Sequence, residues 1–220
     1  VLAGGGTKGA YEVGAWKALK ELNVNIEAIV GTSIGAINGA LFLQDDYNKI
    51  LELYDNIKFE DLVKISEANK LSEGNIFSRE NITKEFTKNK GLENTPMKNL
   101  MEKYIDIEKI YSSSIDYGIV TTSIDLKNKS LEIFKEEIEK EKLYEYILAS
   151  ACFPIFKPQK IGDAQYLDGG MYDNVPVNML LNKGYENIIV IDISNNGISR
   201  KVQNKNAYIK IIKPNEDLGS

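Results

Sequence analysis

Apolar positions along the chain follow two spacings, one typical of helices and one typical of buried strands. Over about Ala10–Leu22, the residues Val13, Trp16, Leu19 and Leu22 recur near one face, while lysine and glutamate occupy the other. Short apolar runs of strand length lie between segments of this helical kind. Because strands and helices alternate along the chain, the pattern indicates an α/β layered fold.

The same criteria predict the remaining elements. Strands are expected at the short apolar runs Val1–Ala3, Glu27–Thr32, Tyr117–Ile124, Leu131–Phe134, Asn187–Ile193 and Ala207–Lys213. Helices are expected at Ile34–Leu43, Glu139–Ala149 and Pro176–Asn182, the last with proline in its first turn and Gly184 just past its end. A hairpin-like turn is expected at residues 125–129, between two of the strands. Three residues before the first glycine make a short strand, so we expect the chain to begin part-way into it.

The segment 44–114 differs from the rest, because it has helical spacing with polar breaks and no clear strand. We interpret it as a helical insertion over one end of the sheet, within a single domain of residues 1–220, since no repeat or low-complexity linker marks a boundary. Its apolar residues, among them Phe77, Met97, Leu100 and Met101, favour a local core over a lipid groove. No apolar stretch in the chain approaches the ~20 residues of a membrane-spanning helix.

Charge excludes some classes of partner. The 220 residues include 27 basic and 32 acidic side chains, for a formal net charge of −5. Binding of nucleic acid is therefore not expected, because phosphate neutralisation needs a basic face. Long-range attraction to an anionic membrane is not favoured either.

The residue types that are missing restrict the chemistry further. The chain has no histidine and one cysteine, Cys152. A Ser-His-Asp triad, a Cys-His pair and a histidine-ligated metal are therefore excluded within this chain, and so is an internal disulfide. Proton transfer has to use aspartate, glutamate, lysine, tyrosine or a terminus. Cys152 is interpreted as a small buried residue.

The first glycine-rich motif is Gly4–Gly9, which fits G-x-G-x-x-G between a strand and a helix. Such a loop points several backbone N–H groups toward one spot at the positive end of a helix. It is suited to a phosphate or an oxyanion, and the alternative is a tight turn with no ligand.

The second motif is Gly31-Thr32-Ser33-Ile34-Gly35, which fits G-x-S-x-G after a strand and before a helix. This is the context of a nucleophile elbow, in which a sharp turn lifts the serine hydroxyl out of the sheet end. The alternative is that Ser33 is simply the N-cap of the helix. A dinucleotide fold is disfavoured, because it requires a carboxylate where Gly31-Thr32-Ser33 ends the second strand.

The third motif is Asp168-Gly169-Gly170 at the end of a short strand-like run. An aspartate beside glycines is often only a turn. A serine nucleophile nevertheless needs a base, and without histidine an aspartate is the natural candidate. Asp173 is the second choice.

Taken together and in this order, the three motifs resemble the signature blocks of the patatin-like phospholipase family. Weaker similarities lie between them, in Ser150–Pro158, Asn174–Val177 and Ile119–Lys129, so that the resemblance spans nearly the whole chain. Two departures are small: Lys8 stands where many relatives have arginine, and the last block is Asp-Gly-Gly where some have Asp-Gly-Ala.

The resemblance implies a three-layer α/β/α sandwich around a mostly parallel central sheet. It also implies hydrolysis of lipid acyl esters, of the phospholipase A or lysophospholipase type, through a Ser-Asp dyad and an acyl-enzyme. Ser33 would be the nucleophile and Asp168 the base, with Gly31 and Gly35 flanking the elbow and the middle insertion supplying the acyl-chain channel. The oxyanion hole would come from Gly4, Gly5, Gly6, Thr7, Lys8 and Gly9.

No metal or other cofactor is expected, and the partner would be a lipid or phospholipid, met at a membrane surface. The implied location is the cytoplasm or the periphery of a membrane, and secretion stays open. Two other functions remain open from the residues: an esterase or thioesterase acting on other acyl substrates, and a non-catalytic lipid-binding module. In either catalytic case, we expect Ser33 and Asp168 to meet within ~2.6–3.2 Å at the carboxyl edge of the sheet.

Overall fold

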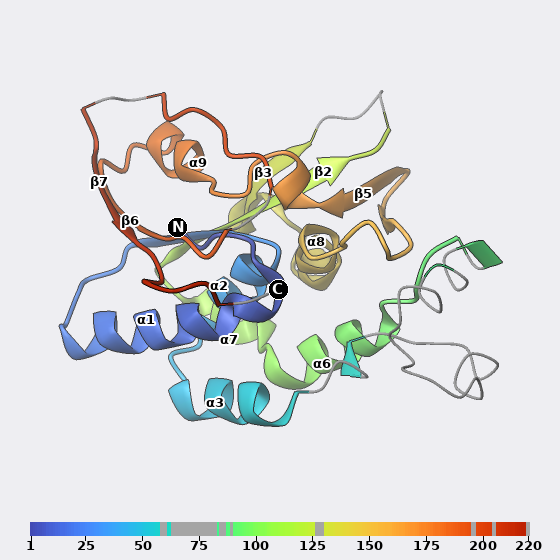
Figure 1. The fold of residues 1–220 in the computed structure, drawn as a ribbon, viewed down its shortest axis with the longest axis horizontal. Coiled ribbons are helices and arrows are strands. Elements are labelled where there is room, and N and C mark those ends of the chain that lie inside the picture. Colours follow the sequence, from blue (N-terminus) through green and yellow to red (C-terminus); the bar gives the residue numbers. More distant parts are fainter. Residues whose placement is uncertain are drawn as a thin grey trace.

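The structure is a computed structural model that describes residues 1–57, 61–62, 83, 87–88, 90–125, 130–194, 197–203 and 206–218. A central β-sheet has helices on both faces, and the N-terminal residues lie inside the sheet (Figure 1). The fold class is therefore the expected α/β arrangement of a sheet with flanking helices. Phe77 and most of the turn at 125–129 lie outside the described residues.

One side of the sheet is parallel. The strands β1 (Ala28–Thr32) and β2 (Asp116–Ser123) pair in parallel, as do β6 (Asn187–Ile191) and β7 (Tyr208–Ile212). Leu2 bridges Gly31 on one side and Ile191 on the other, both in parallel, and so joins the two pairs. Val1–Ala3 is thus part of the sheet, which confirms the expected strand at the start of the chain.

The other side of the sheet is antiparallel. Strand β3 (Leu131–Phe134) lies on one edge of β2, and β5 (Ala164–Asp168) pairs with β2 and with β4 (Gln159–Ile161). Since β3 and β1 both pair with the middle of β2, they occupy its opposite edges. Strand β5 pairs with β2 only beyond the end of β1, on the edge that β3 leaves free. The strands β1 and β5 therefore meet end to end along β2.

That meeting point fixes the site. Thr32, the last residue of β1, lies opposite Val120, and Asp168, the last residue of β5, lies opposite Thr121. The residue after Thr32 is Ser33. Two residues 135 positions apart in sequence are thus neighbours, because two strands of opposite direction end at adjacent positions of a third.

Most helices cover one face of the sheet, and α9 covers the other (Figure 1). The helices of the first group are α1 (Gly9–Glu21), α2 (Ile34–Phe42), α3 (Tyr47–Asn56), α6 (Thr95–Tyr104), α7 (Ile107–Ser112) and α8 (Leu143–Ser150). The opposite face is covered by α9 (Val177–Asn182). Four short 3-10 turns complete the described elements: η1 (Gly6–Lys8), η3 (Lys135–Glu137), η4 (Lys140–Lys142) and η5 (Gly169–Met171).

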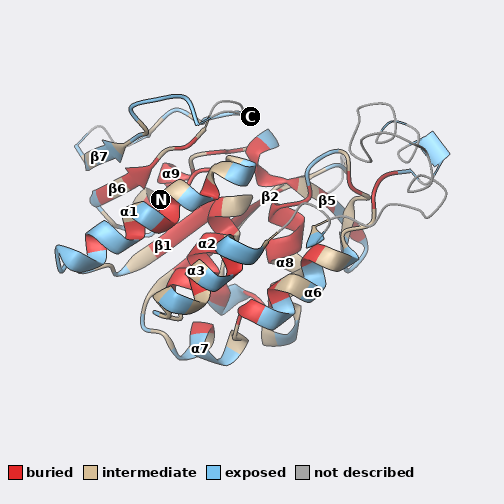
Figure 2. Cartoon of the chain, turned by 60° about the horizontal axis from the view of Figure 1, so that its bottom comes forward, coloured by how far each residue is buried: buried red, intermediate tan, exposed pale blue. Residues whose placement is uncertain are grey.

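The alternation of side chains along β1 and β2 divides the core in two. Ile29 and Ile119 pack into the large cluster with the helices of the first group, where the Trp16 and Phe42 rings stack at 4.7 Å. Val30 and Val120, one position on in each strand, pack into the smaller cluster with α9. Figure 2 accordingly shows that the buried residues lie on the strands and on the helix faces that pack against the sheet.

Three details differ from the expected elements. The strand β4 was missed, because it is three residues long and has only one buried position. The helix expected from Glu139 begins at Leu143, after the separate turn η4. Leu22 was placed on the buried face of α1, but it is 74% exposed because the helix ends at Glu21.

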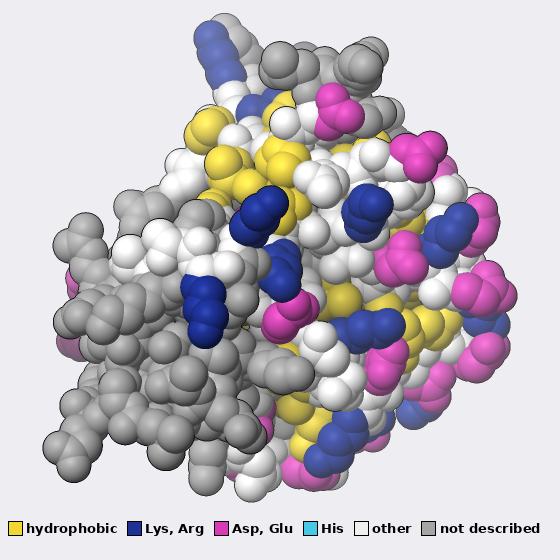
Figure 3. Space-filling model, turned by 90° about the vertical axis from the view of Figure 1, so that its right-hand side faces the viewer, with side chains coloured by type: hydrophobic (Ala, Val, Ile, Leu, Met, Phe, Trp, Pro, Cys, Tyr) yellow, Lys and Arg dark blue, Asp and Glu magenta, His cyan; other side chains and the backbone are white. Residues whose placement is uncertain are grey.

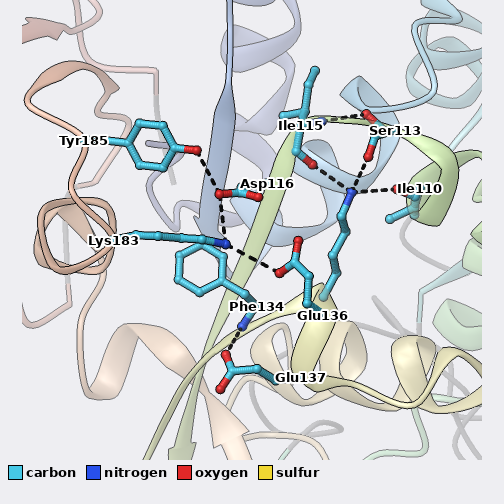
Figure 4. Close-up of polar contacts among 10 residues, drawn as sticks. Ile110, Ser113, Ile115, Asp116, Phe134, Glu136, Glu137, Lys183 and Tyr185 are labelled. Atoms are coloured by element: carbon cyan, nitrogen blue, oxygen red, sulfur yellow. Dashed lines mark hydrogen bonds and ion pairs between the residues drawn. The ribbon is translucent and has the colours of Figure 1, made fainter.

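A buried lysine joins the end of the middle segment to the sheet. The Lys135 ammonium donates to the carbonyl oxygens of Ile110, Ser113 and Ile115 at 3.0, 2.7 and 2.8 Å, and these carbonyls converge on one point at the end of α7 (Figure 4). The lysine therefore caps α7 with its charge.

An ion-pair cluster lies beside this lysine. Lys183 lies 2.8 Å from Asp116 and 3.5 Å from Glu136, and the Tyr185 hydroxyl donates to Asp116 (Figure 4). The face to the right of Figure 1 carries side chains of both charge signs, with hydrophobic side chains gathered in its upper part (Figure 3). No histidine contributes to any of these charges.

Candidate active site

The turn between β1 and α2 has the geometry of a nucleophile elbow. Ser33 has φ 56° and ψ −124°, a backbone conformation that non-glycine residues rarely adopt. The turn requires its flanking glycines: a Cβ on Gly31 would lie 2.2 Å from the Gly35 carbonyl oxygen, and one on Gly35 would lie 2.4 Å from that of Leu2. Strain of this kind at a surface-facing serine is typical of functional sites.

The Ser33 hydroxyl is directed at Asp168. Ser33 Oγ donates to Asp168 Oδ2 at 2.6 Å, and Asp168 Oδ1 accepts the Gly170 N–H at 2.8 Å. Both carboxylate oxygens are thus held, and the distance lies at the short end of the expected range. The aspartate arrives on the antiparallel strand β5, however, and not at the end of a parallel strand as anticipated.

Burial changes the acidity of this carboxyl. Asp168 is 6% exposed, and loss of hydration raises its pKa to about 6, although the hydrogen bonds from Ser33 and Gly170 act in the opposite direction. A carboxylate with this pKa is a stronger base than an ordinary aspartate and is still ionised at neutral pH. The pair can therefore exchange a proton between a hydroxyl and a carboxylate.

Two alternatives for these residues are not supported by the geometry. Ser33 precedes α2, but its side chain makes no capping hydrogen bond to the helix. Asp173 is fully buried, accepts from the N–H groups of Val175 and Arg200, each at 3.3 Å, and does not line the cavity that Ser33 and Asp168 line. Asp168 remains the candidate base.

The glycine-rich loop lies beside the same pair. The Gly4 N–H donates to the Asn174 carbonyl, and the Lys8 and Gly9 N–H groups donate to carbonyls within the turn. The N–H groups of Gly5, Gly6 and Thr7 donate to no other residue in the described part of the chain. Three of the six expected residues thus have backbone donors that are free for a ligand.

Residues that sequence reasoning did not assign hold these parts together. Ser150 Oγ accepts the Ser33 N–H at 2.9 Å, and the Thr32 hydroxyl donates to the Asp173 carbonyl at 2.8 Å. The Asn174 amide donates to the Gly4 carbonyl at 3.0 Å. Ser150 and Asn174 lie in the segments that resemble the family, which was the available signal.

A second polar network supports the far end of the loop. Asn38 Nδ2 donates to the Gly9 carbonyl at 3.0 Å and to Glu12 Oε2 at 2.8 Å, and Asn38 Oδ1 accepts the Tyr54 hydroxyl at 2.7 Å. Glu12 is fully buried, and burial raises its pKa to about 8. The network connects the loop with the helix that follows Ser33.

Ser33 and Asp168 open into a cavity of about 1020 Å³. Its wall is mostly apolar. Helices α2, α3 and α6 and the residues directly after α3 and α6 supply much of it, with side chains such as Leu41, Leu53, Ile57, Met97, Leu100, Met101 and Ile105. The expectation of a local core is borne out for Met97 and Met101, which are buried in the main cluster with Leu100 packed against it, and all three residues also line the cavity. Lys8 lies at the loop side of the same cavity.

No group of three or more acidic, cysteine or histidine side chains in the described ranges is arranged to hold a metal ion. None of the described helices has both the length and the apolar character needed to cross a membrane.

Comparison with protein families agrees with the geometry. The family model described as Patatin-like phospholipase matches residues 1–181. Lysophospholipase NTE1 of Debaryomyces hansenii is 29% identical over 198 residues, which are 88% of this chain and 11% of that protein. Patatin-like phospholipase domain-containing protein 7 of Rattus norvegicus is 26% identical over 196 residues, with 88% and 13% covered. The chain thus spans about a tenth of the length of these relatives.

Among solved structures, VipD from Legionella pneumophila superposes with a TM-score of 0.54. The match covers 86% of this chain and 49% of that one, at 15% sequence identity. At this identity the likeness establishes the fold alone.

Proposed function

The chain belongs to the patatin-like phospholipase family, and on that premise we propose that it hydrolyses lipid acyl esters with Ser33 as nucleophile and Asp168 as base. The observation that carries the proposal is the 2.6 Å hydrogen bond between the two side chains, made by a strained serine at the entrance of an apolar cavity. Relatives named as lysophospholipases point to lipids with one acyl chain as the first substrates to test.

The first half of the reaction forms an acyl-enzyme. Ser33 Oγ attacks the ester carbonyl carbon while its proton passes to Asp168 Oδ2, which already accepts that hydrogen bond. As the tetrahedral intermediate collapses, the bond to the alcohol oxygen breaks and the proton on Asp168 moves to the leaving alcohol. The acyl group is then an ester of Ser33.

The second half releases the fatty acid. Asp168 takes a proton from a water molecule, and the oxygen of that water attacks the acyl carbon. The Ser33–acyl bond breaks, the proton returns to Ser33 Oγ, and a carboxylic acid leaves. Asp168 acts in both halves, which is why its raised pKa matters.

The N–H groups of Gly5 and Gly6 are suited to the developing oxyanion in both halves. They have no other partner among the described residues, and both glycines line the cavity that holds Ser33 and Asp168. A donor of this kind is worth about 3–4 kcal/mol in comparable hydrolases. Lys8, at the wall of the same cavity, would add positive potential for a phosphate.

The decisive experiment is hydrolysis of a panel of lysophospholipids, phospholipids, neutral glycerides, simple esters and thioesters. Ser33→Ala and Asp168→Asn should each lose turnover on the preferred substrate by about a thousandfold or more, since members of such a pair act as a unit. Ser194→Ala is the matched control, because Ser194 also donates to an aspartate, Asp192, but does not line the cavity. It should retain wild-type turnover.

The outcomes separate the possible functions. Turnover restricted to non-lipid esters or thioesters would replace the lipid assignment, while leaving the serine–aspartate chemistry in place. Absence of turnover, together with no labelling of Ser33 by a serine-reactive phosphonate, would indicate a lipid-binding module. Loss of soluble-ester hydrolysis on chelation, restored by calcium, would contradict a metal-independent mechanism.

A further inference from the structure

Large apolar side chains are exposed around the mouth of the cavity. Phe153, Met171 and Ile198 are 57%, 45% and 56% exposed, and all three line the cavity that holds Ser33 and Asp168. They are three of the eight large apolar side chains that are exposed in the described ranges. We call these three residues the rim. Apolar groups gathered at one opening mark a surface that binds something apolar.

The rim is built into the site by the backbone. The Ile198 N–H donates to the Gly170 carbonyl at 2.9 Å, and the Ile198 carbonyl accepts the Asn174 N–H at 2.6 Å. Phe153 directly follows Cys152, whose carbonyl accepts the Asp168 N–H at 2.8 Å. Met171 ends η5, which starts directly after Asp168. Three separate segments are thus tied to the candidate catalytic loop with their apolar side chains outward.

Charge is scarce in this region. Among the described residues that line the cavity, only Lys8 and Asp168 carry a formal charge, whereas 27% of the whole chain is charged. The described lining around the rim is therefore mostly apolar. With a formal net charge of −5, the chain as a whole is not attracted to anionic surfaces.

We propose that the rim inserts into the surface of a lipid aggregate, so that an acyl chain passes from the lipid directly into the cavity. This inference rests on the proposed function. A protein bound over the rim would close the opening, whereas a lipid surface covers the rim and supplies the substrate through that opening. Recognition then depends on apolar insertion and needs no particular head-group charge.

The test compares the double variant Phe153→Ser/Ile198→Ser with Ile211→Ser. Ile211 is the matched control, since it is 52% exposed, lies in β7 and does not line the cavity. Sedimentation with phosphatidylcholine vesicles should show at least about tenfold weaker binding for the double variant and less than twofold change for the control. Thermal unfolding verifies that each variant is folded. The single variant Phe153→Leu keeps an apolar side chain in the rim and should therefore retain most of the vesicle binding of the wild type.

Activity gives a second measurement. Turnover of lipid in vesicles should fall at least about tenfold more than turnover of a soluble short-chain ester in the double variant. Vesicle binding by the wild type should persist at high salt and should not require anionic lipid.

Three results would overturn the inference: equal vesicle binding by the double variant and the wild type, binding that needs anionic lipid and is lost in salt, or no vesicle binding by the wild type. The proposed function fails separately. If Ser33→Ala binds vesicles but the wild type hydrolyses no ester, the rim stands and the enzyme assignment falls. If the wild type hydrolyses soluble esters but the rim substitutions leave vesicle binding unchanged, the enzyme assignment stands and the proposed role of the rim is wrong.

Discussion

Asp168 is held in surroundings that disfavour its charge, and this should be visible in the reaction rate. Burial raises its pKa to about 6, and in the proposed mechanism only the ionised form accepts the proton of Ser33. We therefore expect kcat/KM on a soluble ester to rise about tenfold per pH unit below pH 6 and to level off above it. If kcat/KM instead levels off near pH 4, the Asp168 carboxylate is hydrated and has an ordinary pKa. If kcat/KM continues to rise above pH 7, another group acts as the base.

The same burial should cost stability. A carboxyl whose folded pKa is about 6 and whose ordinary value is 3.8 binds its proton more tightly in the folded state. Its contribution to stability is therefore full below about pH 4 and is lost as the pH rises through about 6, a difference of about 3 kcal/mol. Asp168→Asn removes the charge and should raise the free energy of unfolding by about 1–3 kcal/mol at pH 8.

Denaturant unfolding of both proteins at pH 8 and pH 4 measures this effect. The gain from Asp168→Asn should shrink toward pH 4, where the wild-type carboxyl is protonated as well. A variant that is less stable at pH 8 would mean that the hydrogen bonds to Ser33 and Gly170 outweigh the burial of the charge.

At the scale of elements, the elbow was predictable and its partner strand was not. The constraints on Ser33 are local: a strand, a sharp turn with two small neighbours, and a helix, all within one short motif. The position of Asp168 depends on where β5 pairs along β2, which is a long-range contact that no periodicity encodes. The absence of histidine made an aspartate the candidate base, and the family resemblance then paired Asp168 with Ser33. The resemblance placed an acyl-chain channel in the middle segment, but the pattern could not show which residues line it, because buried and cavity-lining positions such as Met101 share the same helical spacing.

Lys135 is the element-scale contact with the clearest energetic consequence. The residue is 5% exposed, and its ammonium donates to three backbone carbonyls at the end of α7. Lys135→Met keeps the apolar stem but leaves those carbonyls without their donor, which should lower the free energy of unfolding by about 2–4 kcal/mol. Lys140→Met, which removes an ion pair with the exposed Glu108, should change it by less than about 0.5 kcal/mol.

Chemical denaturation of the two variants at one pH provides the comparison. Equal, small effects would mean that water replaces the ammonium at the end of α7. A large effect for Lys135→Met alone would establish that this side chain attaches the middle segment of the chain to β3, the strand that precedes it.

At the scale of the whole molecule, helices from the middle segment and the end of the sheet together enclose one apolar cavity. Strand ends supply Ser33 and Asp168, and α3 and α6 supply much of the inner wall. The sheet therefore determines where a bond is cut, while these helices determine how much of the substrate fits behind that bond. Chemistry and substrate size should consequently respond to different substitutions.

Leu100→Trp tests this division. Leu100 is a half-buried residue of α6 that lines the cavity, and an indole there would occupy space needed by a long acyl chain. The ratio of kcat/KM for palmitate to butyrate esters should fall about tenfold or more. Such a change corresponds to ~1.4 kcal/mol, less than the burial of two methylene groups at ~0.8 kcal/mol each.

Leu51→Trp, at a half-buried position of α3 outside the cavity, is the control and should leave the ratio unchanged. Equal loss on both esters in Leu100→Trp would instead indicate damage to Ser33 or Asp168. An unchanged ratio would mean that the acyl chain lies outside the cavity.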